Sequence, residues 1–263
     1  MTMTFINLLT DFGLQDQYVF QMKAVIKMIS PQSQILDITH GITKFSVKEG
    51  AFILAQAEKY FPKNSIAVAV VDPDVGSNRA CLAIRTEHFT FIGPDNGILY
   101  EAAKIDGLIE VREITSNEII LYKGGTFDGR DVFAPAAAYI AEGFPFRNVG
   151  KKLKNISKYS FSYPIIKQHE LYLEVLYIDH FGNMTLNIQS IDFLKWAKEE
   201  IQFKIYIENS IFIARLVKSY SELSGPGLLI GSSGLLELST NMKGKVINKI
   251  RIGSKLHIKR YTK

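Results

Sequence analysis

The sequence predicts two domains: an α/β domain with a Rossmann-like, mostly parallel sheet, followed by a small antiparallel β-barrel. Strand and helix patterns alternate through the first half of the 263-residue chain, as is typical of βαβ units with parallel strands. In the last third, short strands and turns dominate, with a single helix among them, which is typical of a barrel or sandwich. Between these parts lies an irregular segment that is basic and aromatic. We therefore expect domains at residues 1–157 and 169–263, joined by a linker at 158–168.

The elements of the first domain are predicted from apolar patterns and from the residues that end them. Apolar residues at helical spacing predict a helix from about Asp16 that stops before Pro31. Ser46 and Glu49 have the spacing of a capping box and predict a second helix that ends before Pro62. Strands are predicted at 5–9, 34–38, 65–71, 108–114 and 118–122, a hairpin at 81–85 with 89–92, and an alanine-rich helix at 133–142.

The second domain is predicted as short strands around one helix. Gly- and Ser-containing turns separate runs of β-branched and aromatic residues, which favours an antiparallel arrangement. The predicted strands are 171–178, 184–188, 203–208, 211–216, 228–230, 235–238 and 246–259, and the predicted helix is 190–198.

Composition excludes several classes of protein. The hydrophobic fraction of 47% and charged fraction of 22% are those of a globular protein. The single cysteine, Cys81, excludes an internal disulfide and a cysteine-based zinc cluster, and its apolar neighbours predict a small core residue. The net charge of +5 comes from scattered basic residues, so we expect no nucleic-acid partner. No apolar segment approaches the roughly 20 residues of a membrane helix, and no signal peptide is predicted. We expect a cytoplasmic protein with no membrane partner.

Acidic residues stand at or near several predicted strand ends in the first domain. They are Asp11, Asp72 with Asp74, Asp95, and Asp128 with Asp131. Any one of them alone would be typical of a turn or a helix cap. Carboxyl ends of parallel strands share one edge, where ligands bind, so together they favour a site. Such a site suits a cationic ligand, a ribose diol or a hard metal ion, whereas the phosphate-binding glycine motifs are missing.

Other chemistries receive less support from the sequence. Cys81 has no histidine near it in sequence, so a cysteine nucleophile is not expected. The five histidines lack the spacing of zinc ligands. A magnesium-dependent hydrolase built on the aspartates stays open as an alternative.

Six motifs carry a resemblance to a known family. They are Leu8-Leu9-Thr10-Asp11-Phe12-Gly13, Val70-Val71-Asp72-Pro73, Gly93-Pro94-Asp95-Asn96-Gly97, Gly129-Arg130-Asp131 with Phe133-Ala134-Pro135, Asp179-His180-Phe181-Gly182-Asn183, and Gly231-Ser232-Ser233-Gly234 leading to Asn241. The chain resembles the S-adenosylmethionine (SAM) hydrolases that form adenosine, relatives of the SAM-dependent fluorinase and chlorinase, over nearly its whole length. The resemblance implies an α/β domain, a β-barrel, and a homotrimer with each site between two subunits.

The resemblance also implies a reaction and the residues that bind its substrate. Water or hydroxide would attack C5′ of the ribose and release methionine and adenosine, without a metal or other cofactor. The implied assignments are Asp11 to the ribose hydroxyls, Asp16 and Asp179 to the methionine ammonium, Ser232 to its carboxylate, and Phe181, Asn183 and Tyr220 to the adenine. Further substrate contacts are implied for Phe45, Asp95, Asn96, Asn241 and Met242.

Three positions would orient the attacking water. The resemblance assigns this role to an aspartate, an arginine and a histidine, and Asp72 and Arg79 match the first two. Halogenases have a tyrosine where Asp72 stands, so Asp72 favours water over halide. At the third position the family has Phe-His-Gly-Arg-Asp, whereas this chain has Asp128 in place of the histidine.

The consequence of Asp128 is left open by the sequence. Two carboxylates would share one arginine, and either aspartate could then act as the base. Alternatively, the site is inactive and the protein is a non-catalytic SAM- or adenosine-binding protein. The metal-dependent hydrolase remains the third hypothesis.

Overall fold

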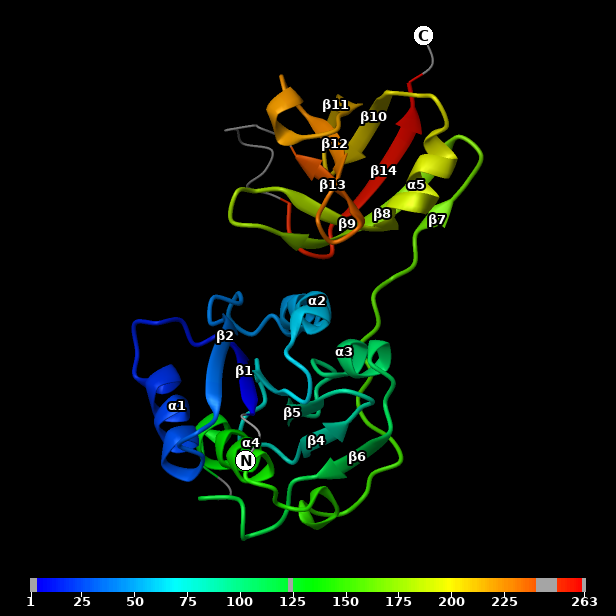
Figure 1. The fold of residues 1–263 in the computed structure, drawn as a ribbon. Helices are drawn as coiled ribbons and strands as arrows, with labels where there is room; N and C mark the ends of the chain where they lie inside the picture. Colours follow the sequence, from blue (N-terminus) through cyan, green and yellow to red (C-terminus); the bar gives the residue numbers. More distant parts are fainter. Residues whose placement is uncertain (1–3, 123–124, 240–249, 262–263) are drawn as a thin grey trace. The chain divides into compact units, whose positions relative to one another are not determined.

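The computed structural model describes residues 4–122, 125–239 and 250–261. The chain divides into two compact units, residues 1–160 and residues 161–263 (Figure 1). The first is built around a six-stranded mixed sheet and the second around a closed barrel. This confirms the predicted fold class.

The sheet of the first unit is parallel over four of its six strands. Its order is β2-β1-β3-β5-β4-β6; β4 pairs antiparallel with both β5 and β6, so β4 alone among these strands runs opposite to the rest. The predicted hairpin is the β4–β5 pair. The bounds are β1 Phe5–Thr10, β2 Gln34–Thr39, β3 Ile66–Val70, β4 Cys81–Arg85, β5 Thr90–Pro94 and β6 Glu110–Glu113.

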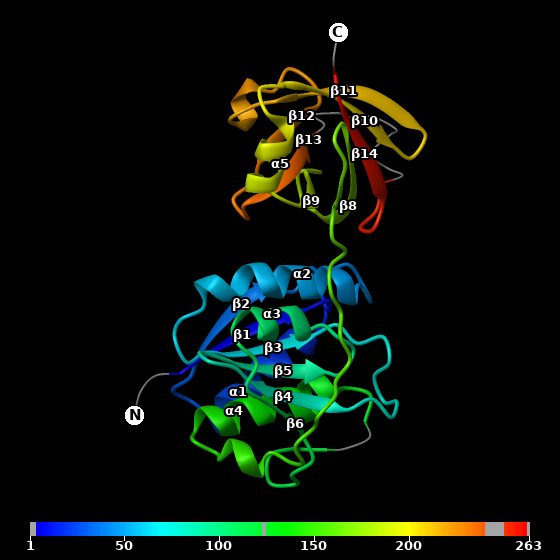
Figure 2. The same cartoon turned by 90° about the vertical axis from the view of Figure 1, so that its right-hand side faces the viewer.

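Helices cover both faces of this sheet (Figure 2). On one face lie α1 (Tyr18–Ile29) and α4 (Ala134–Ala141), and on the other lie α2 (Val47–Ala57) and α3 (Tyr100–Ile105). The fully buried strand β3 serves both cores, because its side chains alternate between the two faces. Three short helical turns complete the unit: η1 Glu58–Tyr60, η2 Gly129–Phe133 and η3 Phe146–Asn148.

Two local predictions for the first unit are wrong. Residues 118–122 form turns and irregular chain rather than a strand: the Leu121 amide donates to the Asp131 carbonyl (2.8 Å), and Ile119 is buried without any strand pairing. The capping box does not form either, because Ser46 makes no side-chain cap. Glu49 instead accepts a hydrogen bond from the Thr43 amide at 3.2 Å, so it fastens the preceding loop.

The second unit is a barrel closed by seven strands. The order is β14-β10-β11-β12-β13-β9-β8, and a further β14–β8 pairing closes it; β7 adds outside this ring, on β8. Its apolar core includes Phe193 and Trp196 of α5 (Ser190–Ala197). The strands are β7 Ile165–Ile166, β8 Glu170–Ile178, β9 Met184–Gln189, β10 Gln202–Ile207, β11 Ser210–Leu216, β12 Gly227–Ile230, β13 Leu235–Ser239 and β14 Lys255–Arg260; a turn, η4, spans Tyr220–Glu222.

Three details of the barrel differ from the sequence predictions. Strands β11 and β12 pair in parallel, so the barrel is not purely antiparallel. Strand β7 lies inside the segment predicted as a linker. The last predicted strand, 246–259, is too long: residues 250–254 are not strand, and residues 246–249 lie outside the described part of the chain.

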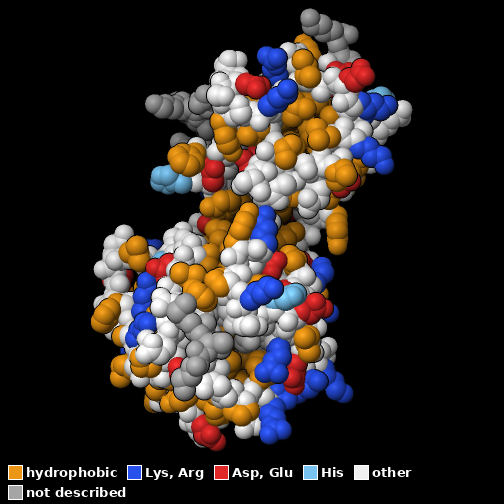
Figure 3. Space-filling model, in the orientation of Figure 1, with side chains coloured by type: hydrophobic (Ala, Val, Ile, Leu, Met, Phe, Trp, Pro, Cys, Tyr) orange, Lys and Arg blue, Asp and Glu red, His pale blue; other side chains and the backbone are white. Residues whose placement is uncertain are grey.

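The face of the molecule drawn in Figure 3 carries no single dominant charge. On the face seen in Figure 3, basic side chains are interspersed with acidic and apolar ones. None of the helices in the described ranges has the length and apolar character needed to cross a membrane.

Candidate active site

The carboxyl ends of two neighbouring parallel strands place the first acidic residues of the site. In the β1–β3 register Thr10 lies beside Val70, so Asp11 and Asp72 emerge at the same edge of the sheet. After Asp72 the chain makes a tight turn in which Gly76 has a φ of +82° and the Ser77 amide donates to the Asp74 carbonyl at 3.0 Å. This turn brings Arg79 back toward Asp72.

Arg79 lies between two carboxylates. Its Nε donates to Asp72 Oδ1 at 2.9 Å and its Nη2 to Asp72 Oδ2, while Nη2 also donates to Asp128 Oδ2 at 2.5 Å. The side chains of Arg79, Asp72 and Asp128 are only 8%, 4% and 10% exposed. Charged hydrogen bonds of this bidentate kind fix both distance and orientation. Burial of Arg79 lowers its pKa, but the hydrogen bonds that it donates to Asp72 and Asp128 outweigh this effect. The pKa of Arg79 is therefore raised above its ordinary value.

Cys81 occupies the remaining side of the Arg79 guanidinium. Its Sγ accepts from Arg79 Nη1 at 3.2 Å, and the ring of Phe133 lies 5.7 Å from the guanidinium carbon. Burial raises the pKa of the Cys81 thiol to about 11, so the sulfur stays protonated near neutral pH. The predicted core position is thus also a contact of the charge cluster.

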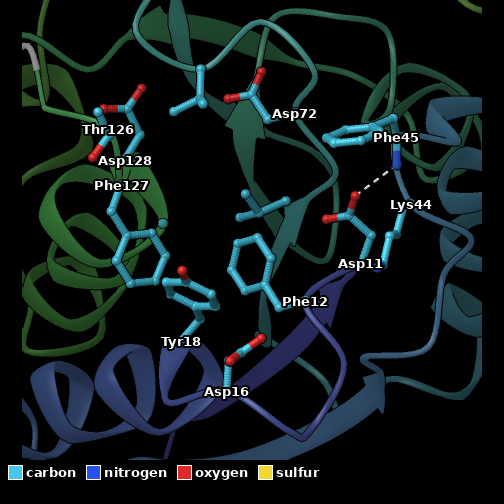
Figure 4. Close-up of a pocket in the computed structure, with 13 residues that line it drawn as sticks. Asp11, Phe12, Asp16, Tyr18, Lys44, Phe45, Asp72, Thr126, Phe127 and Asp128 are labelled. Atoms are coloured by element: carbon cyan, nitrogen blue, oxygen red, sulfur yellow. Dashed lines mark hydrogen bonds between the residues drawn. The ribbon is translucent and has the colours of Figure 1, made fainter.

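Asp72 and Asp128 line a cavity of about 510 Å³ in the first unit. Asp11 and Asp16 line it as well, so four carboxylates belong to its wall (Figure 4). Asp128 directly precedes η2 and lines the cavity from that position. Asp131, three residues further along the chain and inside η2, does not line the cavity and instead binds Arg130 through both oxygens, at 2.7 and 2.9 Å.

Aromatic rings form another part of the wall. Phe12, Tyr18 and Phe127 meet edge to face, with centroids 5.2 to 5.8 Å apart. These three rings were not among the residues predicted for the site, although Phe12 and Phe127 adjoin Asp11 and Asp128. Their position next to acidic residues at strand and helix ends was the sequence feature that could have indicated an aromatic wall.

Asp11 is tied to the loop that precedes α2. Its Oδ2 accepts from the Phe45 amide at 2.8 Å, and Phe45 has a φ of +66°, which is costly for a residue with a side chain. The Phe45 ring is 66% exposed and lines the cavity beside Lys44. Burial raises the pKa of the Asp11 carboxyl above its ordinary value, opposed by the hydrogen bond from Phe45.

Asp95 and Asn96 do not line this cavity. Asp95 Oδ1 accepts from the Ser157 amide at 2.7 Å, and Asn96 donates through Nδ2 to the Val71 carbonyl at 2.8 Å. Both side chains therefore hold neighbouring loops in the described structure.

In the second unit, the predicted residues Asp179, Phe181 and Asn183 share the β8–β9 turn. Asp179 Oδ1 accepts from the amides of Phe181 and Asn183 at 2.9 and 2.8 Å, and its Oδ2 accepts from Asn183 Nδ2 at 2.8 Å. The Phe181 ring is 86% exposed at the tip of this turn. Hydrogen bonds to Asp179 thus hold the turn, while the Phe181 ring, in edge-to-face contact with His180, stays exposed.

Two further predicted residues of the second unit, Tyr220 in η4 and Ser232, lie in the described part of the chain. The Tyr220 hydroxyl donates to Glu237 Oε2 at 2.5 Å, and burial together with that bond raises the Tyr220 pKa above its ordinary value. Ser232 is exposed in the turn that follows β12. Asn241 and Met242 lie outside the described residues.

Comparison with known proteins identifies the family. The sequence matches the SAM hydroxide adenosyltransferase N-terminal domain over residues 6–150 and the corresponding C-terminal domain over residues 173–257. The chain belongs to the SAM hydroxide adenosyltransferase family. It is thus an enzyme of a SAM-using family, and the resemblance drawn from its motifs is confirmed.

Named relatives of the protein include both SAM hydrolases and a fluorinase. An (R)-S-adenosyl-L-methionine hydrolase of Salinispora tropica is 35% identical over 69% of this chain and 70% of its own length. The hydrolase of Methanocaldococcus jannaschii is 34% identical over 90% and 88%. A fluorinase of Nocardia brasiliensis is 28% identical over 72% and 73%. Family membership alone therefore does not distinguish water from halide as the nucleophile, and the residues of the site have to do so.

A solved structure shares the fold of the whole chain. The crystal structure of an uncharacterized conserved protein from Thermotoga maritima has a TM-score of 0.89 and 32% identity, and the match covers 97% of this chain and all of that one. The two-unit architecture is therefore also found in a relative solved by experiment.

Two of the four carboxylates on the cavity wall, those of Asp72 and Asp128, bind Arg79. Within the described ranges, no group of three histidine, cysteine, aspartate or glutamate side chains is arranged to hold a metal ion. A cation at Asp72 and Asp128 would also have to compete with the guanidinium of Arg79, which already binds three of their four oxygens.

Proposed function

We propose that the protein hydrolyses SAM to adenosine and L-methionine by attack of water or hydroxide at C5′ of the ribose. The observation that carries this proposal is the Asp72–Arg79–Asp128 cluster on the wall of the cavity. The cluster joins the two positions that match the family's water-orienting residues with the third position, where Asp128 replaces a histidine. Asp128 lies within hydrogen-bond distance of Arg79 and so remains a member of the group.

For this reaction the protein has to position the attacking water and accept its proton. The water oxygen forms a bond to C5′ while the C5′–S bond breaks. The electron pair of the broken bond goes to sulfur, which becomes the neutral thioether of methionine. The water proton passes to a carboxylate. Because the sulfonium is already a good leaving group, no cofactor is required, and alignment of water, carbon and sulfur supplies the main acceleration.

Asp128 is the better placed of the two aspartates to take the proton. Both oxygens of Asp72 accept from Arg79, whereas Asp128 engages Arg79 through Oδ2 alone. Its Oδ1 makes no hydrogen bond to any residue that the structure describes, so it can accept one from water. We assign orientation of the water to Asp72 and Arg79 and general-base action to Asp128.

The charge of the cluster favours water over halide. Two carboxylates beside one guanidinium leave a net negative charge, which repels an incoming fluoride or chloride. The same charge stabilises the sulfonium cation in the ground state and does not hinder a neutral nucleophile. This supports hydrolase rather than halogenase activity.

Substrate binding is proposed for residues of both units. Asp11 would accept from the ribose hydroxyls, Asp16 and Asp179 would bind the ammonium, and Ser232 the carboxylate. Phe181, Asn183 and Tyr220 would contact the adenine, with further contacts from Phe45, Asn241 and Met242. Because Asp95 and Asn96 hold loops, we assign them an indirect role.

The proposed working form is a cytoplasmic homotrimer in which each site combines residues of two subunits. Its support is the family resemblance. Its only proposed ligands are SAM and the two products, with no nucleic-acid or membrane partner.

Product analysis distinguishes the proposal from its alternatives. The protein is incubated with SAM, with and without a chelator, and the products are separated by chromatography. Adenosine and methionine in equal amounts, with chelator present, support hydrolysis. Tight SAM binding without turnover would instead support a binding protein, and loss of activity with chelator would support a metal-dependent hydrolase.

A further inference from the structure

One cation lines the acidic cavity. Among the described residues of its wall, Lys44 is the single lysine or arginine, and four carboxylates line the same wall (Figure 4). It makes no ion pair with any of the described residues, and its side chain is exposed. An unpaired lysine in a cavity that binds a sulfonium would weaken binding unless an anionic part of the ligand lies near it.

The backbone that carries Lys44 is held in place. The amide of Phe45 donates to Asp11 Oδ2 at 2.8 Å, and the amide of Ser46 donates to the Thr43 carbonyl at 2.9 Å. The residue that follows Lys44 is therefore fastened to the same carboxylate that is proposed to bind the ribose. A fixed Cα with a free ammonium end suits recognition of a ligand group rather than support of the fold.

The charges of SAM identify the group that Lys44 can recognise. SAM has two cations, the sulfonium and the ammonium, and one anion, the α-carboxylate. The cavity offers carboxylates to both cations, while Arg79 is already engaged by Asp72 and Asp128. Ser232, to which the resemblance assigns the same carboxylate, is a neutral hydroxyl and supplies no charge. Lys44 supplies the positive charge that complements the α-carboxylate.

We propose that Lys44 binds the α-carboxylate of SAM and makes the enzyme prefer SAM to adenosyl sulfoniums that lack this group. This inference rests on the proposed function and extends it to substrate specificity. Lys44 acts in binding and not in the bond-breaking step, so its removal should raise KM and leave kcat nearly unchanged.

Decarboxylated SAM provides the decisive comparison, because it keeps the sulfonium and the amine and lacks only the carboxylate. The kinetic constants for SAM and decarboxylated SAM are measured with the wild type, Lys44→Met, Lys44→Arg and a control, Lys63→Met, at an exposed lysine that does not line the cavity. We expect Lys44→Met to lower kcat/KM for SAM about 5- to 10-fold, as for one exposed charged hydrogen bond. Decarboxylated SAM should be processed at least as well as by the wild type.

The variants separate charge recognition from other effects. Lys44→Arg should keep the preference for SAM, and Lys63→Met should behave as the wild type. An equal loss for both substrates in Lys44→Met, or no loss for SAM, would overturn the proposal. If none of the proteins turns over either compound, hydrolysis is refuted, and the same four proteins are compared by calorimetric affinity for the two compounds. The Lys44 assignment then stands or falls on whether Lys44→Met weakens SAM alone.

Discussion

At the scale of single residues, the site depends on one guanidinium shared by two carboxylates. Asp72 and Asp128 come from segments far apart in the sequence, and each contributes a nearly buried side chain to Arg79. A buried arginine stabilises two such carboxylates only when both are within hydrogen-bond distance, as they are here. In the proposed mechanism, Asp128 therefore takes the place of the family histidine as proton acceptor, within a cluster that keeps its contact with Arg79.

Substitutions in the cluster test these roles. Asp72→Ala should reduce hydrolysis by at least about 100-fold, because Arg79 loses its bidentate partner and the water its orientation. Asp128→His should keep or raise activity, since a neutral imidazole can also accept the proton. Steady-state rates of adenosine formation provide the measurement. Asp74→Asn, in the exposed part of the same turn, is the matched control and should be unaffected. Full activity in Asp72→Ala together with inactivity of Asp128→His would contradict the assignment.

Protonation of Asp11 should weaken SAM binding at acid pH. Its burial raises its pKa above the ordinary 3.8, so on acidification the carboxylate is lost at a higher pH than for an exposed aspartate. The protonated form accepts fewer hydrogen bonds from the ribose hydroxyls. Calorimetric affinity for SAM should therefore fall as the pH drops toward 3.8 from above, and Asp11→Asn should bind weakly with no such fall. An unchanged wild-type affinity down to that pH would contradict the role of Asp11.

At the scale of secondary-structure elements, apolar periodicity predicted most of the fold. Strands β1, β3, β8 and β9 lie within a residue or two of their predicted positions, because each is a largely buried apolar run between turn residues. The segment 118–122 is also rich in apolar residues and yet is not a strand, since the Leu121 amide donates to Asp131 in a helical turn and the Ile119 amide donates to Ser116 in the same loop. Which partner a short apolar run finds is a tertiary property.

The site was predictable to a similar extent. Acidic residues at strand ends led to Asp11 and Asp72, because parallel topology brings such ends together. The cavity wall formed by Phe12, Tyr18, Phe127 and Lys44 was not predicted. These residues meet only through loop conformations, such as the left-handed Phe45, that sequence patterns do not encode.

The left-handed conformation of Phe45 should appear in the stability of its variants. With a φ of +66°, glycine at this position avoids the strain that alanine retains. Phe45→Gly should therefore be more stable than Phe45→Ala by about 0.5–1 kcal/mol in urea unfolding, since both lack the ring. At Lys44, which is not among the positive-φ residues, the order should reverse, with alanine the more stable. Equal stabilities at position 45 would show that the loop relaxes.

At the scale of the whole molecule, the proposed substrate contacts divide between the two units. The cavity with its charge cluster belongs to the first, and the exposed ring of Phe181 with Asp179 and Asn183 belongs to the second. In a homotrimer with shared sites, each active centre would combine a first unit and a second unit from neighbouring subunits.

Complementation between subunits tests this assembly. Asp72→Ala disables the first unit and Asp179→Ala the second, so each variant alone should be inactive. Co-expressed in equal amounts, they should regain about a quarter of wild-type activity, because random mixing pairs two intact units at about one interface in four. Sedimentation of the mixture should give a trimer. Absence of any regained activity in mixed trimers would place each site within one chain.

Following the oxygen of the attacking water tests hydrolysis at C5′ directly. SAM is incubated with the enzyme in heavy-oxygen water with a chelator present, and both products are analysed by mass spectrometry. Attack at C5′ predicts adenosine that carries the heavy oxygen in its 5′-hydroxyl, together with unlabelled methionine. Unlabelled adenosine, a label in the amino-acid product, or the absence of adenosine altogether would contradict hydrolysis at C5′.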